Sequence, residues 1–232
     1  MRLSVVIPAY NEEATIRVIL ERVRAVEIVD QIVVVNDSST DGTRAELSGL
    51  EWPNLTVIHH PVNQGKGAAI RTGIAAVTGN LVVIQDADLE YDPREFPRLM
   101  RPITERRAHA VYGSRFLGRP RKMTIVQWVG NRFLTLSTNL LYGTALTDME
   151  TCYKLMPTRL ARSLDLRCRR YDVEPEITAK LLRAGYKILE VPISYEGRDE
   201  AAGKKIRWTD GFPALRALAV NRVGPSPLPP PD

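Results

Sequence analysis

Short apolar runs alternate along the first half of the chain with segments whose apolar residues recur every three or four positions. Continuous apolar runs are typical of strands that are buried on both faces of a parallel sheet. The segments between them predict helices over 16–26, after residue 42 and over about 67–77. This order predicts an α/β fold with a doubly wound, mostly parallel central sheet and helices on both of its faces. The four predicted strands are 3–7, 32–35, 55–58 and 81–84.

The second half of the chain continues without a linker or a break in composition as far as residue 224. A single domain over residues 1–223 is therefore expected. Residues 224–232 contain so many prolines that they are expected to form an extended, mobile tail that does not pack. The apolar pattern of this half predicts strands at 110–112 and 187–195 and helices at 125–142 and 173–183.

Polar residues come directly after three of the predicted strands. In doubly wound sheets, ligands bind beyond the carboxyl ends of the strands. The polar residues there are therefore the first candidates for a ligand site. They lie in the segments 8–12, 36–37 and 85–88.

Two of these residues, Asp86 and Asp88, are carboxylates spaced two apart at the end of a strand, so they point to the same side. Neighbouring carboxylates repel each other, and a divalent cation relieves the repulsion. Mg²⁺ or Mn²⁺ is commonly held by one or two carboxylates together with substrate phosphates. A helix cap in front of Pro93 is the alternative. The strand-end position favours the metal.

Asp37 follows the second predicted strand and can accept hydrogen bonds from a nucleoside, although aspartate is also common in turns. Its place beside the Asp86 pair favours the nucleoside. Gly65 and Gly67 are rejected as a dinucleotide-binding loop, because Ile70 occupies the third glycine position and the segment follows the third strand. The two glycines are expected to let a helix begin close to the sheet, with Lys66 directed at the site.

Charge is distributed unevenly along the chain: residues 1–100 carry a net charge of −5, and residues 101–232 carry +10. Arg115 follows the predicted strand 110–112, and a glycine-containing basic loop contains Arg198 and Lys204. Such residues match phosphate groups. Binding to nucleic acid is disfavoured, because the acidic first half would repel a polyanion. Asp148 and Glu150 are candidates for acid–base work or for orienting an acceptor.

The composition of the chain restricts the cellular compartment in which the protein is expected. Two cysteines cannot form a disulfide framework or a four-ligand zinc site, which favours reduced thiols and a cytoplasmic protein. No apolar run has the roughly 20 residues that a membrane span needs. The chain opens directly into a predicted strand, so no signal peptide is expected.

Taken together, these motifs resemble those of family-two inverting glycosyltransferases of the GT-A fold, and more narrowly the dolichyl- or polyprenyl-phosphate mannosyltransferase-like branch. The resemblance covers roughly residues 1–212 and implies a nucleotide-binding half over about 1–115 and an acceptor half over about 116–223. The residues that carry it lie at 5–12, 34–43, 63–67, 85–89 and 113–115.

The resemblance also implies roles for individual residues. The nucleoside of a sugar nucleotide would be held by Pro8, Tyr10, Glu12 and Asp37, with Ala87 against the nucleotide and Lys66 directed at the site. Mg²⁺ or Mn²⁺ would be held on the diphosphate by Asp86 and Asp88, with Glu90 as a third candidate ligand near the metal. Arg115, Arg198 and Lys204 would bind phosphates of the donor or the acceptor.

The expected reaction is therefore transfer of a hexose, mannose favoured and glucose an alternative, from a GDP- or UDP-sugar to a polyprenyl phosphate. A lipid phosphate is already anionic, so it needs positioning more than deprotonation. A soluble enzyme acting on a hydroxyl would need a base such as Asp148 or Glu150. A non-catalytic module that binds nucleotide sugars is a further alternative.

Contact with the inner face of the membrane has two candidate routes. The segment 212–223 combines apolar residues with Arg216 and Arg222, a composition that suits an anionic interface, although a helix packed on the domain has the same pattern. A partner subunit with its own membrane helices is the other route.

Overall fold

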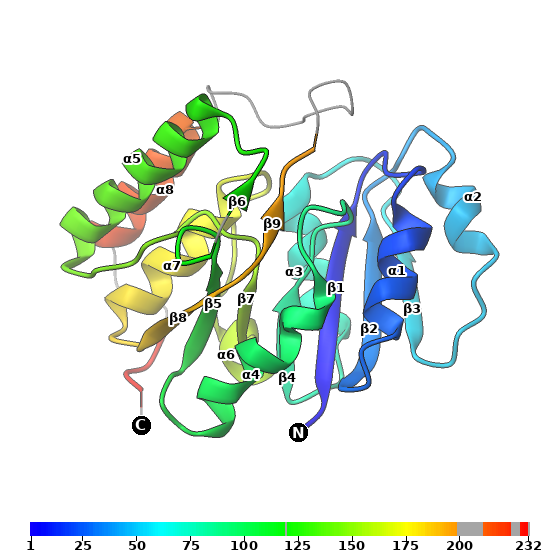
Figure 1. The fold of residues 1–232 in the computed structure, drawn as a ribbon, viewed down its shortest axis with the longest axis horizontal. Helices are drawn as coiled ribbons and strands as arrows, with labels where there is room; N and C mark the ends of the chain where they lie inside the picture. The colour runs from blue at the N-terminus through cyan, green and yellow to red at the C-terminus, as the bar shows by residue number, and fades with distance from the viewer. Residues whose placement is uncertain (119, 199–210, 224–227, 232) are drawn as a thin grey trace.

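A computed structural model describes residues 1–118, 120–198, 211–223 and 228–231 of the chain. Within these residues the main sheet has seven strands in the order β3-β2-β1-β4-β7-β5-β8, and a small second sheet pairs β6 with β9 (Figure 1). The strands are β1 (Leu3–Ala9), β2 (Val29–Asn36), β3 (Leu55–His59), β4 (Leu81–Ile84), β5 (Ala110–Ser114), β6 (Pro120–Arg121), β7 (Lys154–Pro157), β8 (Ile188–Pro192) and β9 (Tyr195–Glu196).

The helices confirm the predicted alternation with the strands. Four of them precede β5 or lead into it: α1 (Ile16–Arg24), α2 (Thr43–Ser48), α3 (Lys66–Ala76) and α4 (Phe96–Thr104), the last preceded by a 3₁₀ turn, η1 (Pro93–Glu95). The others are α5 (Ile125–Tyr142), α6 (Thr158–Ser163), α7 (Val173–Arg183) and α8 (Gly211–Val223). Among the described residues, no helix combines the length and the hydropathy that a bilayer span requires.

The predicted doubly wound, mostly parallel sheet is confirmed, with one strand that the apolar pattern did not predict. β1 to β4 are mutually parallel where they pair, and β5 is parallel to β8. β7 lies between β4 and β5 and is antiparallel to both. Its sequence, Lys154-Leu155-Met156-Pro157, has too few apolar residues for a recognisable buried run. The predicted strand 187–195 is divided into β8 and β9.

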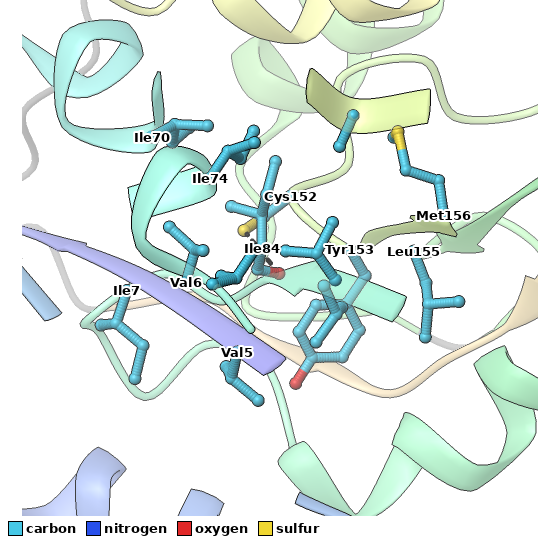
Figure 2. Packing of buried hydrophobic residues seen from close by; sticks show 14 of the residues in the cluster. Val5, Val6, Ile7, Ile70, Ile74, Ile84, Cys152, Tyr153, Leu155 and Met156 are labelled. Carbon is cyan, nitrogen blue, oxygen red and sulfur yellow. Dashed lines mark hydrogen bonds between the residues drawn. The ribbon is translucent and has the colours of Figure 1, made fainter. Parts of the chain in front are cut away.

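Helices cover both faces of the sheet. Val6 of β1 points to the face of the sheet that is covered by Ile70 and Ile74 of α3 (Figure 2). Val5 and Tyr153 point to the opposite face (Figure 2). On that opposite face, the ring of Tyr153 packs at a tilt against Phe96 of α4, with ring centroids 5.5 Å apart. These side chains are almost completely buried. The hydrophobic core therefore continues through the sheet from α3 to α4.

Helices α5 and α8 form a layer beyond the sheet. α8 packs against both α7 and α5, and α5 and α8 lie side by side at the upper left of Figure 1. α7 is fixed to the sheet by a 2.9 Å hydrogen bond between Thr178 and the hydroxyl of Tyr112 in β5. α7 thus connects the α5–α8 layer to the body of the fold.

The expectation that no part of the tail packs is wrong at Leu228, which is 5% exposed and belongs to the main core. Pro231 also reaches Gly185, with 3.9 Å between its ring and a Cβ built on the glycine. Prolines therefore do not keep this stretch off the domain, because one leucine among them has a core position to fill.

The glycines around Lys66 allow a close approach between the start of α3 and the segment 168–170. A Cβ on Gly67 would lie 2.4 Å from the backbone oxygen of Cys168. The amide of Gly67 also donates a 2.8 Å hydrogen bond to the carbonyl of Arg169. Gly65 has a φ of 93°, which only glycine adopts readily. The start of α3 therefore packs on residues 168–170, while α3 also contacts β1 and β2 of the sheet.

Gly67→Ala should lower the stability of the fold, because the added methyl group would displace backbone at Cys168. Overpacking of this kind costs roughly 1–3 kcal/mol. The matched control is Gly130→Ala in α5, where an added Cβ meets nothing within 4 Å and helix propensity favours alanine. Thermal denaturation should show a lower Tm for the first variant only. Equal melting temperatures would contradict the close-approach argument.

Candidate active site

The carboxyl ends of β1, β2 and β4 open into a cavity of about 570 Å³ whose walls include residues of α3, α5, α7 and α8. It brings together residues that are far apart in the sequence. The sequence-predicted residues that line it are Pro8, Tyr10, Glu12, Asp37, Lys66, Asp86, Ala87, Asp88, Glu90, Arg115, Glu150 and Arg198. Asp148 lies behind the wall, and Lys204 lies outside the described residues.

The turns that follow β1 and β2 support one another at the edge of the cavity. Asn11 and Ser38 both adopt a positive φ, of 53° and 59°. Asn11 donates its amide to the hydroxyl of Ser39 and accepts the amide of Thr40, at 3.0 and 2.8 Å. Positive φ at residues other than glycine is costly and persists where surrounding contacts enforce it. These cross-links fix the two strand ends that line the site.

Asp37 is buried and rigidly held. His60 contacts it at 2.7 Å, and the backbone amides of Gln64 and Gly65 donate to its two oxygens at 2.9 and 2.7 Å. Sequence reasoning assigned no role to His60. In the structure His60 fixes Asp37, and Asp37 in turn fixes the glycine turn that precedes Lys66.

Lys66 joins two carboxylates across the cavity. Its Nζ lies 2.7 Å from Asp86 and 2.8 Å from Glu174 in the first turn of α7. Burial opposes the charge on Lys66, but these two carboxylates raise its pKa well above the ordinary value. Asp86 experiences the converse: burial disfavours its charge, yet Lys66 lowers the pKa of Asp86. The pair is therefore charged on both sides.

Arg198 lies over the remaining carboxylates. Its guanidinium is 2.6 Å from Asp88 and 3.2 Å from Glu12. Even so, burial, followed by repulsion from Asp86 and Glu90, raises the pKa of Asp88 to about 7. Asp88 is therefore less stable in its charged form than Asp86, although Arg198 contacts it.

Glu90 has a different neighbourhood from the Asp86 pair. One of its oxygens accepts the hydroxyl of Tyr195 at 2.9 Å, and the other accepts the backbone amide of Arg198 at 3.0 Å. Glu90 thus anchors the segment that carries Arg198.

Asp86 and Asp88 fit a hard divalent cation. Within the described ranges, no group of three or more histidine, cysteine or acidic side chains is arranged to hold a metal by itself. Mg²⁺ and Mn²⁺ do not need such a group where phosphates complete the shell. The raised pKa of Asp88 indicates that added positive charge would be favourable there.

Arg115 presents a rigid guanidinium to the cavity. Its Nε and Nη2 atoms donate to the two oxygens of Asp148, each at 2.7 Å. Asp148 is completely buried, and the backbone amides of Thr147 and Asp148 donate to Glu190 of β8 at 2.7 and 2.9 Å. A buried carboxylate that holds an arginine in bidentate geometry is suited to orienting it for an anion.

Several cavity residues were not predicted as site residues from the sequence. They come from α5, α7, α8 and the segments before β7 and α7, where helical periodicity indicates core packing and nothing identifies a ligand wall. Glu174 had one usable signal, an acidic residue in the first turn of a helix otherwise rich in apolar positions. The unpredicted residues include Gln127, Asn131, Leu134, Cys152, Arg170, Tyr171, Glu174 and Ala214.

Comparisons with known proteins agree with the family suggested by the motifs. The family profile described as "Glycosyl transferase family 2" matches residues 4–160. An undecaprenyl-phosphate mannosyltransferase of Micrococcus luteus is 29% identical over 218 residues, covering 88% of this chain and 87% of that protein. A dolichyl-phosphate beta-glucosyltransferase of Trichomonas vaginalis is 30% identical over 229 residues, covering 88% of this chain and 68% of the relative.

A solved structure supports the fold. Glucosyl-3-phosphoglycerate synthase from Mycobacterium tuberculosis, in complex with Mn²⁺ and UDP-glucose, matches with a TM-score of 0.74 at 24% identity, covering 95% of this chain and 78% of that one. The expected GT-A arrangement is thereby confirmed. The profile match over residues 4–160 shows that the chain belongs to glycosyl transferase family 2 and is a glycosyltransferase.

Proposed function

We propose that this glycosyltransferase moves a hexose, mannose favoured and glucose the alternative, from a GDP- or UDP-sugar to a polyprenyl phosphate, inverting the anomeric centre. The observation that carries the proposal is the make-up of the cavity wall. Its polar side holds Asp86, Asp88 and Arg115, and its other side comes from α5 and α8. One cavity therefore offers anion-binding and cation-binding groups next to an apolar surface.

The donor would bind at the ends of β1, β2 and β4. Asp37 and the turns after β1 and β2 form a rigid surface for the nucleoside, and Asp86 and Asp88 would hold Mg²⁺ or Mn²⁺. When bound, such an ion stabilises the departing diphosphate as a Lewis acid. The Mn²⁺ and UDP-glucose named for the structural neighbour support this arrangement. Once the guanidinium of Arg198 moves away from Asp88, it can serve as a counter-ion for the diphosphate.

The acceptor phosphate would bind at Arg115. The guanidinium is held in one orientation by Asp148, so little entropy is lost when an anion binds. No histidine is among the described residues that line the cavity. An anionic acceptor needs no such base, which favours a phosphate over a hydroxyl group. The names of the two relatives given above state that they transfer sugars to lipid phosphates.

The lipid chain would approach along α5 and α8. Val126 and Leu134 of α5 and Ala214 of α8 line the cavity, and the same two helices expose many large apolar side chains. Large apolar side chains exposed together on neighbouring helices mark an interaction site. The exposed residues are Ile125, Val126, Trp128, Val129, Phe133, Leu136, Leu140, Leu141, Phe212, Val220 and Val223.

Basic residues accompany this apolar surface. Arg132 of α5 and Arg216 and Arg222 of α8 are exposed beside it. Apolar side chains flanked by arginines suit the headgroup region of an anionic bilayer. The apolar residues above define the α5–α8 surface. We therefore propose that the protein is cytoplasmic and that this surface binds the inner face of the membrane.

A water-soluble hydroxyl acceptor is the second candidate, and one observation favours it. Burial, and then repulsion from Glu174, raises the pKa of Glu150 to about 8 at the cavity wall. A carboxylate of that pKa is suited to act as a general base. Transfer to a soluble sugar in the absence of lipid would support this candidate.

Screening GDP-mannose, UDP-glucose and UDP-N-acetylglucosamine against a polyprenyl phosphate with either metal tests the primary proposal.

Asp88→Asn should reduce transfer by on the order of a thousandfold, because metal-assisted departure of the diphosphate is worth several kcal/mol. The fold should stay intact, since burial already disfavours the charge on Asp88. The measurement is the initial rate with and without EDTA, together with Tm. Asp92→Asn is the matched control, because Asp92 lies outside this cavity. Full activity in Asp88→Asn would refute the metal assignment.

Asp148→Asn should raise the KM for the phosphate acceptor about tenfold and change kcat less, because Arg115 loses the charged partner that orients it. Steady-state kinetics at varied acceptor concentration measures the split. Asp165→Asn is the control, because its pair with Arg167 is exposed and contributes little. An unchanged KM in Asp148→Asn would remove Arg115 from the acceptor site.

The double variant Phe133→Glu/Leu140→Glu should lose binding to anionic vesicles by about tenfold or more, because two large apolar side chains no longer enter the bilayer. Co-sedimentation at low and high salt gives the apolar and electrostatic contributions. Val62→Glu, at an exposed apolar position after β3, should bind as the wild type does. Equal binding by both variants would show that the α5–α8 surface does not meet the membrane.

A further inference from the structure

Two buried carboxylate oxygens stand without a hydrogen-bond partner in the described part of the chain, Oε1 of Glu150 and Oε2 of Glu174. They come from different segments: Glu150 precedes β7, and Glu174 lies in the first turn of α7. Both residues line the cavity, and Glu174 is only 6% exposed. Two unpartnered acceptors therefore border the same space.

Such oxygens are expensive to keep. A buried acceptor without a donor costs about 1–3 kcal/mol, and more when it is charged. Proteins satisfy nearly all of their buried polar groups, so an exception calls for a functional explanation. Other carboxylates of the fold show the usual solution: Glu176, two residues after Glu174, contacts Lys180 at 2.6 Å and accepts the amide of Cys168 at 2.8 Å.

Nearby cations do not complete these two oxygens. Lys154 donates to the backbone carbonyls of Met149 and Thr151. Lys66 uses the other oxygen of Glu174, at 2.8 Å, and also contacts Asp86. Because both residues line the cavity, a ligand bound there can supply the missing donors.

The chemistry of the two groups restricts the ligand. An acidic side chain accepts hydrogen bonds when ionised and both donates and accepts them when protonated, and two acidic side chains at one place disfavour an anionic phosphate. A hexose is uncharged and carries several hydroxyl donors, so it can satisfy both oxygens at once. Asp86 lies 2.7 Å from the same Lys66 that contacts Glu174, which sets these acceptors next to the proposed diphosphate position.

We infer that Glu150 and Glu174 form the subsite that recognises hydroxyl groups of the transferred hexose. The inference rests on the proposed function, which supplies a nucleotide sugar. Glu174 also positions Lys66, whereas Glu150 has no such second task. Glu150 is therefore the residue on which recognition of the sugar can be tested separately.

The experiment compares equilibrium binding of UDP with UDP-glucose and of GDP with GDP-mannose, each with Mn²⁺. The hexose increment is the ratio of the two dissociation constants. In Glu150→Leu the increment should fall roughly tenfold, as expected for the loss of a hydrogen bond to the hexose, while UDP or GDP affinity stays unchanged. Glu150→Gln retains one acceptor and should keep part of the increment.

Thermal stability provides a second readout. Glu150→Leu removes a buried unpaired oxygen, so its Tm should equal or exceed that of the wild type. Glu176→Gln is the matched control: it breaks a satisfied buried pair, so its Tm should fall while its hexose increment stays the same. A lower Tm in Glu150→Leu would overturn the inference, because it would show a structural role.

Two further outcomes separate this inference from the proposed function. Wild-type protein that binds UDP or GDP without any hexose increment overturns the subsite alone, as does Glu150→Leu that binds nucleotide sugar normally but loses turnover. Wild-type protein that binds none of the four nucleotides refutes the proposed function and the subsite with it.

Discussion

The structure depends on buried carboxylates that are held by cations from distant parts of the chain. Lys66 at the start of α3 joins Asp86 after β4 to Glu174 of α7, and Arg198 joins Asp88 to Glu12. Each cation compensates charge that burial makes costly. Charged residues of the acidic first half and of the basic second half thus meet in one cavity. There the positive and negative side chains alternate and pair with each other, and they do not form two separate charged surfaces.

This arrangement sets how the site responds to ligands. The proposed divalent cation and diphosphate would bring charges of opposite sign, so Arg198 could exchange its contact with Asp88 for one with phosphate while the cluster stayed compensated. Arg115 behaves differently, because Asp148 is completely buried and holds it in bidentate geometry. The site therefore combines a cation that can be exchanged with one that is fixed.

Sequence reasoning predicted the sheet and the residues at its carboxyl edge, because strand ends carry the motif residues from Pro8 to Asp88 in chain order. It failed where a residue's role depends on a partner far along the chain. Asp148 shows no sequence sign that it holds Arg115, and His60 none that it fixes Asp37. β7 escaped because an antiparallel strand of four residues leaves no periodic pattern. The place of Lys204 in the site stays a prediction, since it lies outside the described residues.

The proposed function requires that a polar sugar donor and an apolar lipid acceptor meet in the same cavity. Glu150 and Glu174 border the polar side of the cavity, whereas Leu134 and Ala214 belong to helices whose outer surface is apolar. α7 contacts both regions: its first turn supplies Glu174, and its length packs against α8. A sugar held by the two carboxylates and a lipid held along α5 and α8 would therefore be positioned by the same helix. This shared support gives the fold a physical means of aligning them.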